Sequence, residues 1–213
     1  MGSRNHARHR SRRQAGFTLA EVLVAGAIGA GVMVAAGQAL VASATLTARA
    51  GRELREQEFR QRALRLIAMD LALARRLSAA PEAETPPCGG SARTTVLHLE
   101  VGGGRPAIAW AVGAAPSPIW RGPVLWRCGP AYGLDGTPSL AGAWQSRVVL
   151  DGLADPGTGG TCAATGLAEG SELAGSLALG LAVCRQATTG LVGVRLEQRS
   201  GGAAQGLFPA AAG

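Results

Sequence analysis

The chain contains no lysine at any of its 213 positions. A phosphate-binding P-loop depends on the lysine of its motif, so this class of nucleotide site is excluded. The four cysteines include no C-x-x-C pair, which argues against a zinc site. The run from Asp151 to Asp155 lacks the full calcium-loop pattern. We therefore expect neither a metal nor any other cofactor.

Proline and charge are missing from much of the N-terminal part. No proline occurs from Met1 through Ala80, and no charged residue occurs from Val22 to Ala48. At a rise of about 1.5 Å per residue, a helix over 17–41 would span a bilayer core of about 30 Å. Several glycines in this run would let neighbouring helices approach closely. The segment 17–41 is therefore predicted to be a transmembrane helix.

Acidic residues are also missing from 1–16, a segment that contains five arginines. This pattern is typical of a positively charged leader that keeps the N-terminus in the cytoplasm. A nucleic-acid-binding arm is the alternative interpretation. Without the leader, 16 basic residues stand against 14 acidic ones, and the formal net charge falls from +7 to +2. The remaining chain gives no reason to expect binding to nucleic acid.

Between the leader and the apolar run lies the string Gly16-Phe17-Thr18-Leu19-Ala20-Glu21. A charge at the centre of a spanning helix costs about 2.5–3.5 kcal/mol on insertion scales, so a carboxylate here points to a function. Glu21 is the only charged residue between Arg13 and Arg49. The order of leader, glycine, glutamate and apolar run resembles the processing site of type IV prepilins and type II secretion pseudopilins.

The resemblance implies a sequence of events at this site. A prepilin peptidase would cleave after Gly16, the new N-terminal Phe17 would be methylated, and Glu21 would guide assembly. The segment from Arg62 to Arg76 is similar to the corresponding helix of the W and J minor subclasses. The implied protein is a minor pilin or pseudopilin, a structural subunit and no enzyme. Its partners would be the peptidase, the inner membrane and other subunits, with its head in the periplasm before incorporation into a filament.

A secretory signal peptide is a second interpretation. Ala42-Ser43-Ala44 has the A-x-A form of a signal-peptidase site, and cleavage there would release a binding or enzymatic domain. Against it, Glu21 interrupts the apolar region, and that region exceeds the usual length of about 7–15 residues. A third interpretation is a single-pass sensor or adaptor that keeps its leader.

The segment 42–80 changes to an amphipathic composition with apolar residues at helical spacing. We expect one unbroken helix to about Ser78, ended by Ala79-Ala80-Pro81, followed by a linker through Pro87. Asp70 falls on or beside the apolar stripe. We expect it to be solvated or paired with an arginine one turn away, with contact to a partner subunit as the alternative.

The segment 81–200 is predicted to be a β-rich head, and 201–213 a flexible tail. Apolar residues alternate along several runs separated by glycine and proline clusters, which favours an antiparallel sheet with irregular loops. The four tryptophans would supply its main packing mass. The fold class is therefore α+β, with one long N-terminal helix and a small sheet-containing head. The alternating runs are Leu97–Val101, Ile108–Val112, Leu177–Val183 and Val192–Leu196.

All the cysteines lie in this head, at Cys88, Cys128, Cys162 and Cys184. An even number in an exported segment predicts two disulfides, whose three possible connectivities stay open. Four buried free thiols are the alternative. The only histidine outside the leader is His98, which the strand pattern assigns a structural role. We therefore expect no catalytic residue.

Overall fold

The computed structural model describes residues 16–78, 88, 93–103, 107–154, 162–167, 180–200 and 202–209. Residues 1–15 of the predicted leader 1–16 and the linker 81–87 lie outside these residues. The chain divides into two units, Met1–Arg52 and Glu53–Gly213. It is an α+β protein with one long helix and antiparallel sheets, as the sequence predicts. Its helix is α1 (Leu19–Leu73), which continues from the first unit into the second.

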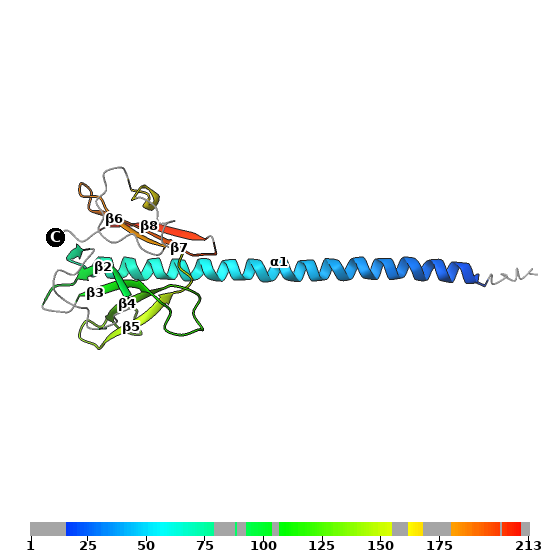
Figure 1. Cartoon of the computed structure of the whole chain (residues 1–213), viewed down its shortest axis with the longest axis horizontal. Coiled ribbons are helices and arrows are strands. Elements are labelled where there is room, and N and C mark those ends of the chain that lie inside the picture. The colour runs from blue at the N-terminus through cyan, green and yellow to red at the C-terminus, as the bar shows by residue number, and fades with distance from the viewer. Residues whose placement is uncertain are drawn as a thin grey trace, which may run out of the picture. The chain divides into compact units, whose positions relative to one another are not determined.

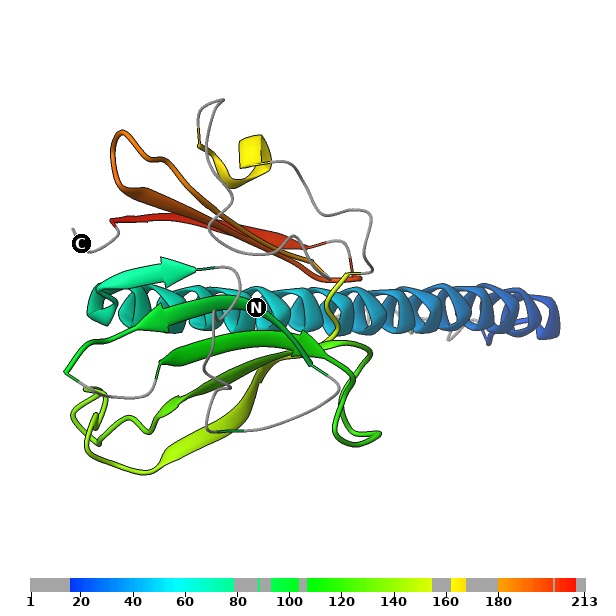
Figure 2. The same cartoon turned by 60° about the vertical axis from the view of Figure 1, so that its left-hand side comes forward.

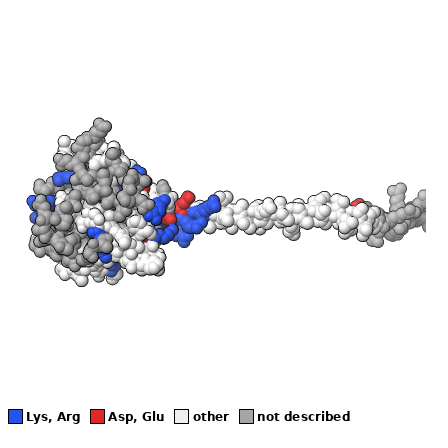
Figure 3. Space-filling view, viewed as in Figure 1, with Lys and Arg blue, Asp and Glu red and all other residues white. Residues whose placement is uncertain are grey.

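In the first unit, every residue of α1 from Leu19 to Ala50 is exposed. It contains a window of mean hydropathy 2.0, and by length and composition it could cross a membrane. No charge interrupts its surface between Glu21 and Arg49 (Figure 3). The hydroxyls of Ser43 and Thr45 donate to backbone carbonyls within the helix, both at 2.8 Å. These bonds keep the two polar side chains satisfied without water.

The helix ends earlier than the predicted Ser78. Its last residue is Leu73, and β1 (Arg76–Ser78) follows almost at once. The Arg75 amide donates to the Glu100 carbonyl at 2.7 Å, and β1 then pairs antiparallel with β2 (Arg93–Glu100). Pairing with a distant strand replaces the last helical turn, and periodicity within the segment gives no sign of it.

The larger sheet has five antiparallel strands in the order β1-β2-β3-β4-β5. The predicted strands at Leu97–Val101 and Ile108–Val112 correspond to β2 and β3 (Ile108–Gly113). The sequence pattern did not predict β4 (Val124–Pro130) or β5 (Trp144–Leu150). Every residue of β4 is buried, so it has no alternation of apolar and polar positions to reveal it.

The smaller sheet has the order β6-β7-β8 and is also antiparallel. Its strands are β6 (Leu181–Arg185), β7 (Leu191–Glu197) and β8 (Ala203–Pro209), with the short helix η1 (Cys162–Thr165) nearby. The strand expected over Leu177–Val183 is described only from Leu181, while 177–179 lie outside the described residues. The tail prediction is corrected for 203–209, because β8 pairs with β7 along its whole length.

The core of the second unit forms where the two sheets meet opposite sides of α1 (Figures 1 and 2). Ala63, Ile67 and Leu71 on α1 are completely buried there, a spacing of four that matches the helical repeat. Trp110 and Trp126 are buried as expected, whereas Trp120 and Trp144 are only half-buried.

Two disulfides join the cysteines, as the even number predicts. Cys88 is bonded to Cys128 on β4, and Cys162 on η1 is bonded to Cys184 on β6. No cysteine is free, so the alternative of four thiols is wrong. The first disulfide joins the segment between β1 and β2 to β4 of the larger sheet. The second joins η1 to β6 of the smaller sheet.

Candidate functional site

The N-terminal site begins with non-helical chain and continues as helix. Gly16, Phe17 and Thr18 are not helical, and α1 begins at Leu19. The side chain of Phe17 is exposed to 87%. The peptide bond between Gly16 and Phe17 therefore lies outside the helical hydrogen-bond ladder.

Thr18 and Glu21 form a reciprocal cap on the helix. The Thr18 amide donates to Glu21 Oε2 at 2.9 Å, and the Glu21 amide donates to Thr18 Oγ1 at 3.3 Å. The Thr18 hydroxyl also donates to Glu21 Oε2, at 3.1 Å. This is a capping box, in which two residues three positions apart satisfy backbone donors that have no partner inside the helix.

The cap uses only one oxygen of the Glu21 carboxylate. All hydrogen bonds that Glu21 accepts from described residues end on Oε2, which leaves Oε1 for a further donor. The carboxylate also lies in the first helical turn, where the helix dipole favours negative charge. Sequence reasoning identified Glu21 but not the part that Thr18 plays. The T-x-x-E spacing carries the signal that could have found it.

A second polar centre lies in the head, around Asp70. This carboxylate is completely buried and accepts four hydrogen bonds. Arg127 donates through Nε and Nη2, both at 2.7 Å, in a two-pronged ion pair. Trp110 Nε1 donates at 3.0 Å and the Tyr132 hydroxyl at 2.9 Å. One carboxylate thus ties α1 to β3, to β4 and to the residues after β4.

Burial and the charge of Asp70 together change the pKa values of the groups that contact this carboxylate. Desolvation lowers the pKa of Arg127, but the hydrogen bond and the charge of Asp70 outweigh it and raise that pKa above its ordinary value. Burial raises the pKa of Tyr132, and the Asp70 charge raises it further. Both groups therefore keep their protons while the head is folded.

The expectation for Asp70 needs correction. It is neither solvated nor paired one turn away, because its partner Arg127 lies 57 residues along the chain. The signal in the sequence was a pair of exceptions. One is an acid in an apolar helical stripe, and the other is an arginine within the apolar run of β4. Buried charges need partners, but the sequence does not show that Asp70 and Arg127 pair with each other.

A second buried arginine was missed entirely. Arg60 on α1 donates to Gln198 Oε1 at 2.7 Å, and Gln198 Nε2 donates to the Asp151 carbonyl at 2.8 Å. This chain of contacts joins α1 to the residues that follow β7 and β5. His98 is buried in β2, consistent with a structural position. In the described parts of the chain, no three His, Cys, Asp or Glu side chains gather as metal ligands.

Comparison with known proteins adds no family to these observations. No protein-family model matches the chain, and neither a curated protein nor a solved structure is detectably similar to it.

Proposed function

We propose that this protein is a filament subunit of the pilin type, a minor pilin or pseudopilin processed after Gly16. The observation that carries the proposal is the arrangement of the N-terminal site. A non-helical Gly16–Phe17 bond precedes a capped helix, and that helix holds Glu21 in its first turn ahead of a long uncharged surface. The assembled filament would be a type IV pilus or a type II secretion pseudopilus.

The role of Glu21 follows from the cost of its charge. In a bilayer, the carboxylate is poorly solvated, although the cap with Thr18 satisfies one of its oxygens. Cleavage after Gly16 would create a positive amine on Phe17, and methylation would retain that charge. In a filament, Glu21 Oε1 can accept from the Phe17 amine of its own or a neighbouring subunit. That ion pair would offset the desolvation of both groups.

The disulfides support placement of the head outside the cytoplasm. Disulfides persist in oxidising compartments such as the periplasm, and both bonds lie in the head. With the basic leader in the cytoplasm, one crossing by α1 puts the head on the opposite side of the inner membrane. The proposed location is the inner membrane first and the filament afterwards.

The N-terminal residue of the membrane-extracted protein tests processing. Peptide mass spectrometry should find methylated Phe17 at the terminus. A terminus at Thr45 would mean signal-peptidase release after Ala44, and an intact leader would mean a retained sensor or adaptor. Either result would contradict the proposal. The backbone at Ala42–Ala44 is helical, which does not favour cleavage there.

Three substitutions separate the charge of Glu21 from its cap. Glu21→Gln keeps a side chain that can cap the helix but removes the charge, whereas Glu21→Ala removes both. Thr18→Ala weakens the cap and leaves the carboxylate in place. We expect both Glu21 variants to be processed and stable yet missing from sheared filaments, while Thr18→Ala assembles. Normal assembly of Glu21→Gln would show that charge pairing is not the mechanism.

A further inference from the structure

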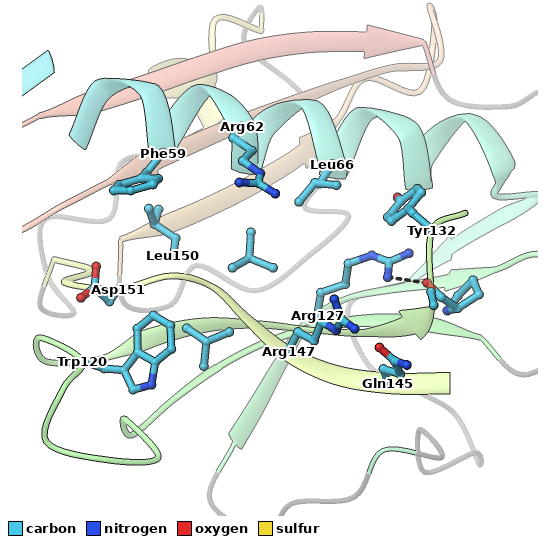
Figure 4. Close-up of a pocket in the computed structure, with 14 residues that line it drawn as sticks. Phe59, Arg62, Leu66, Trp120, Arg127, Tyr132, Gln145, Arg147, Leu150 and Asp151 are labelled. Atoms are coloured by element: carbon cyan, nitrogen blue, oxygen red, sulfur yellow. Dashed lines mark hydrogen bonds between the residues drawn. The ribbon is translucent and has the colours of Figure 1, made fainter. Parts of the chain in front are cut away.

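A groove lies in the head between α1 and β5. Its volume is about 570 Å³, which is in the range of ligand-binding pockets. Phe59, Arg62 and Leu66 line it from α1, and Trp120 lies across from them (Figure 4). Phe59 is 51% exposed, a large apolar surface for a residue of the head. The groove therefore offers an exposed apolar surface at Phe59.

The opposite wall is the edge of a sheet. β5 is the last strand in its sheet, and the residues from Arg147 to Asp151 all line the groove. Successive side chains of a strand point to opposite faces, so a continuous run of lining residues indicates that the groove runs along β5 rather than across it. A bulge at Val149 interrupts the pairing with β4, which leaves Trp144–Val148 as the regular part of this edge.

The outer edge of β5 has backbone and side-chain polar groups that can bond to a guest. Among the described residues, the backbone of β5 makes hydrogen bonds only with β4. The Gln145 side chain lines the groove, and its Oε1 is buried without a hydrogen-bond partner. Unpaired strand edges accept further strands, and a buried oxygen without a donor costs free energy. Both features favour a guest that carries backbone N–H groups.

The charge that remains unpaired in the groove is positive. Arg62 on α1 points into it, and Arg147 on β5 lines it, with no ion pair to a described residue for either (Figure 4). Arg127 also reaches the groove, but Asp70 holds it. The acid at the end of the groove, Asp151, is already engaged by Arg121, whose amide donates to Oδ2 at 3.0 Å. A guest would therefore need carboxylates.

We infer that this groove binds an extended acidic segment of a partner protein, added as a strand to the outer edge of β5. Carboxylates at alternate positions would face Arg62 and Arg147. The guest backbone would pair with Gln145–Val148. Beyond the bulge at Val149, apolar side chains of the guest would pack on Phe59 and Trp120. Main-chain bonds would supply affinity and the alternate pockets specificity. The inference does not depend on processing at Gly16 or on filament assembly.

Short fluorescent peptides with capped ends provide the probe, with the full-length protein in detergent. A peptide of alternating glutamate and valine should bind, and its lysine and valine counterpart should bind at least tenfold more weakly. Two further peptides carry N-methyl groups, one on all glutamate amides and the other on all valine amides. In a strand, alternate residues direct their amides to opposite edges, so only one of these two peptides should lose binding.

Charge-reversal variants map the site. Arg62→Glu and Arg147→Glu should each weaken binding of the acidic peptide about tenfold, which corresponds to 1.4 kcal/mol. Arg65→Glu is the matched control, because Arg65 is also exposed on α1 but does not line the groove. Unchanged thermal unfolding would show that these surface variants fold. The inference is overturned by equal binding of both N-methylated peptides, by equal binding to all three variants, or by N-acetylglutamate binding as tightly as the peptide.

Discussion

Asp70 shows how much of the head rests on a single side chain. Its carboxylate is completely buried, and its four hydrogen bonds join a helix to strands of the larger sheet. A buried ion pair contributes little beyond well-packed apolar residues, but the loss of one partner is costly because the other charge stays buried. The pair is therefore better understood as fixing where α1 contacts the sheet than as a large net source of stability.

Replacement of Asp70 by alanine should lower the free energy of unfolding of the head by about 3–5 kcal/mol, since it leaves the Arg127 charge without a partner. Denaturant titration followed by tryptophan fluorescence measures this loss. All four tryptophans lie in the head, so the signal reports on this unit alone. Asp70→Leu combined with Arg127→Leu is the control, and it should recover much of the loss. A single variant as stable as the unchanged protein would contradict the assigned pair.

Tyr132 gives a prediction about alkaline pH. It is the only tyrosine of the chain, and burial with the Asp70 charge raises its pKa above the ordinary value of about 10. Above about pH 10, the folded head thus holds a proton that the unfolded chain has lost. The contribution of Tyr132 to stability is complete below that pH and decreases as the pH rises.

Near-ultraviolet absorbance of tyrosinate measures this ionisation directly. In native protein, tyrosinate should form only well above pH 10, or together with alkaline unfolding. In denaturant, it should form near the ordinary pKa. Native protein that ionises at the same pH as denatured protein would show that Tyr132 does not bond to the buried carboxylate.

At the scale of elements, β7 meets η1 at a glycine. A Cβ built on Gly193 would lie 2.5 Å from Thr165 Oγ1 and 2.8 Å from Thr165 Cβ. The pairing of Gly193 with Cys184 places this contact beside the disulfide that holds η1 to β6. The absence of a side chain at Gly193 is what allows η1 to approach the smaller sheet so closely.

Gly193→Ala should therefore destabilise the head by about 1–3 kcal/mol through overpacking. Thermal or denaturant unfolding measures the effect. In a double-mutant cycle, Thr165→Ala combined with Gly193→Ala should cost less than the sum of the single changes, because it removes the conflicting hydroxyl. Strict additivity would show that the two residues do not touch.

At the scale of the molecule, the two disulfides limit the freedom of a glycine-rich unfolded chain. They close loops of 40 and 22 residues, each worth about 3–4 kcal/mol by the chain-entropy model. Alkylation of the denatured, unreduced protein should label no cysteine. Peptide mapping should find Cys88 with Cys128 and Cys162 with Cys184. Any other pairing would contradict the fold of the head.

Local pattern made part of this fold predictable. The uncharged run, which is long enough to cross a membrane, indicates the first half of α1. The alternation of apolar with other residues indicates β2, β3 and β7. The T-x-x-E spacing from Thr18 to Glu21 likewise indicates the helix cap. These features depend on neighbours within a few residues, so the sequence by itself determines them.

Contacts between residues far apart in the sequence decided the rest of the fold. β4 is buried along its length and shows no alternation, and β8 forms only because β7 offers it an edge. The partners of Asp70 and the choice among three disulfide connectivities depend on which distant segments the fold brings together. The groove beside β5 likewise needs α1 and a sheet edge in one place. The periodicity of a sequence determines local structure such as helices and alternating strands. Pairing between distant residues depends instead on burial and loop closure across the whole chain, so only the tertiary structure shows which residues pair.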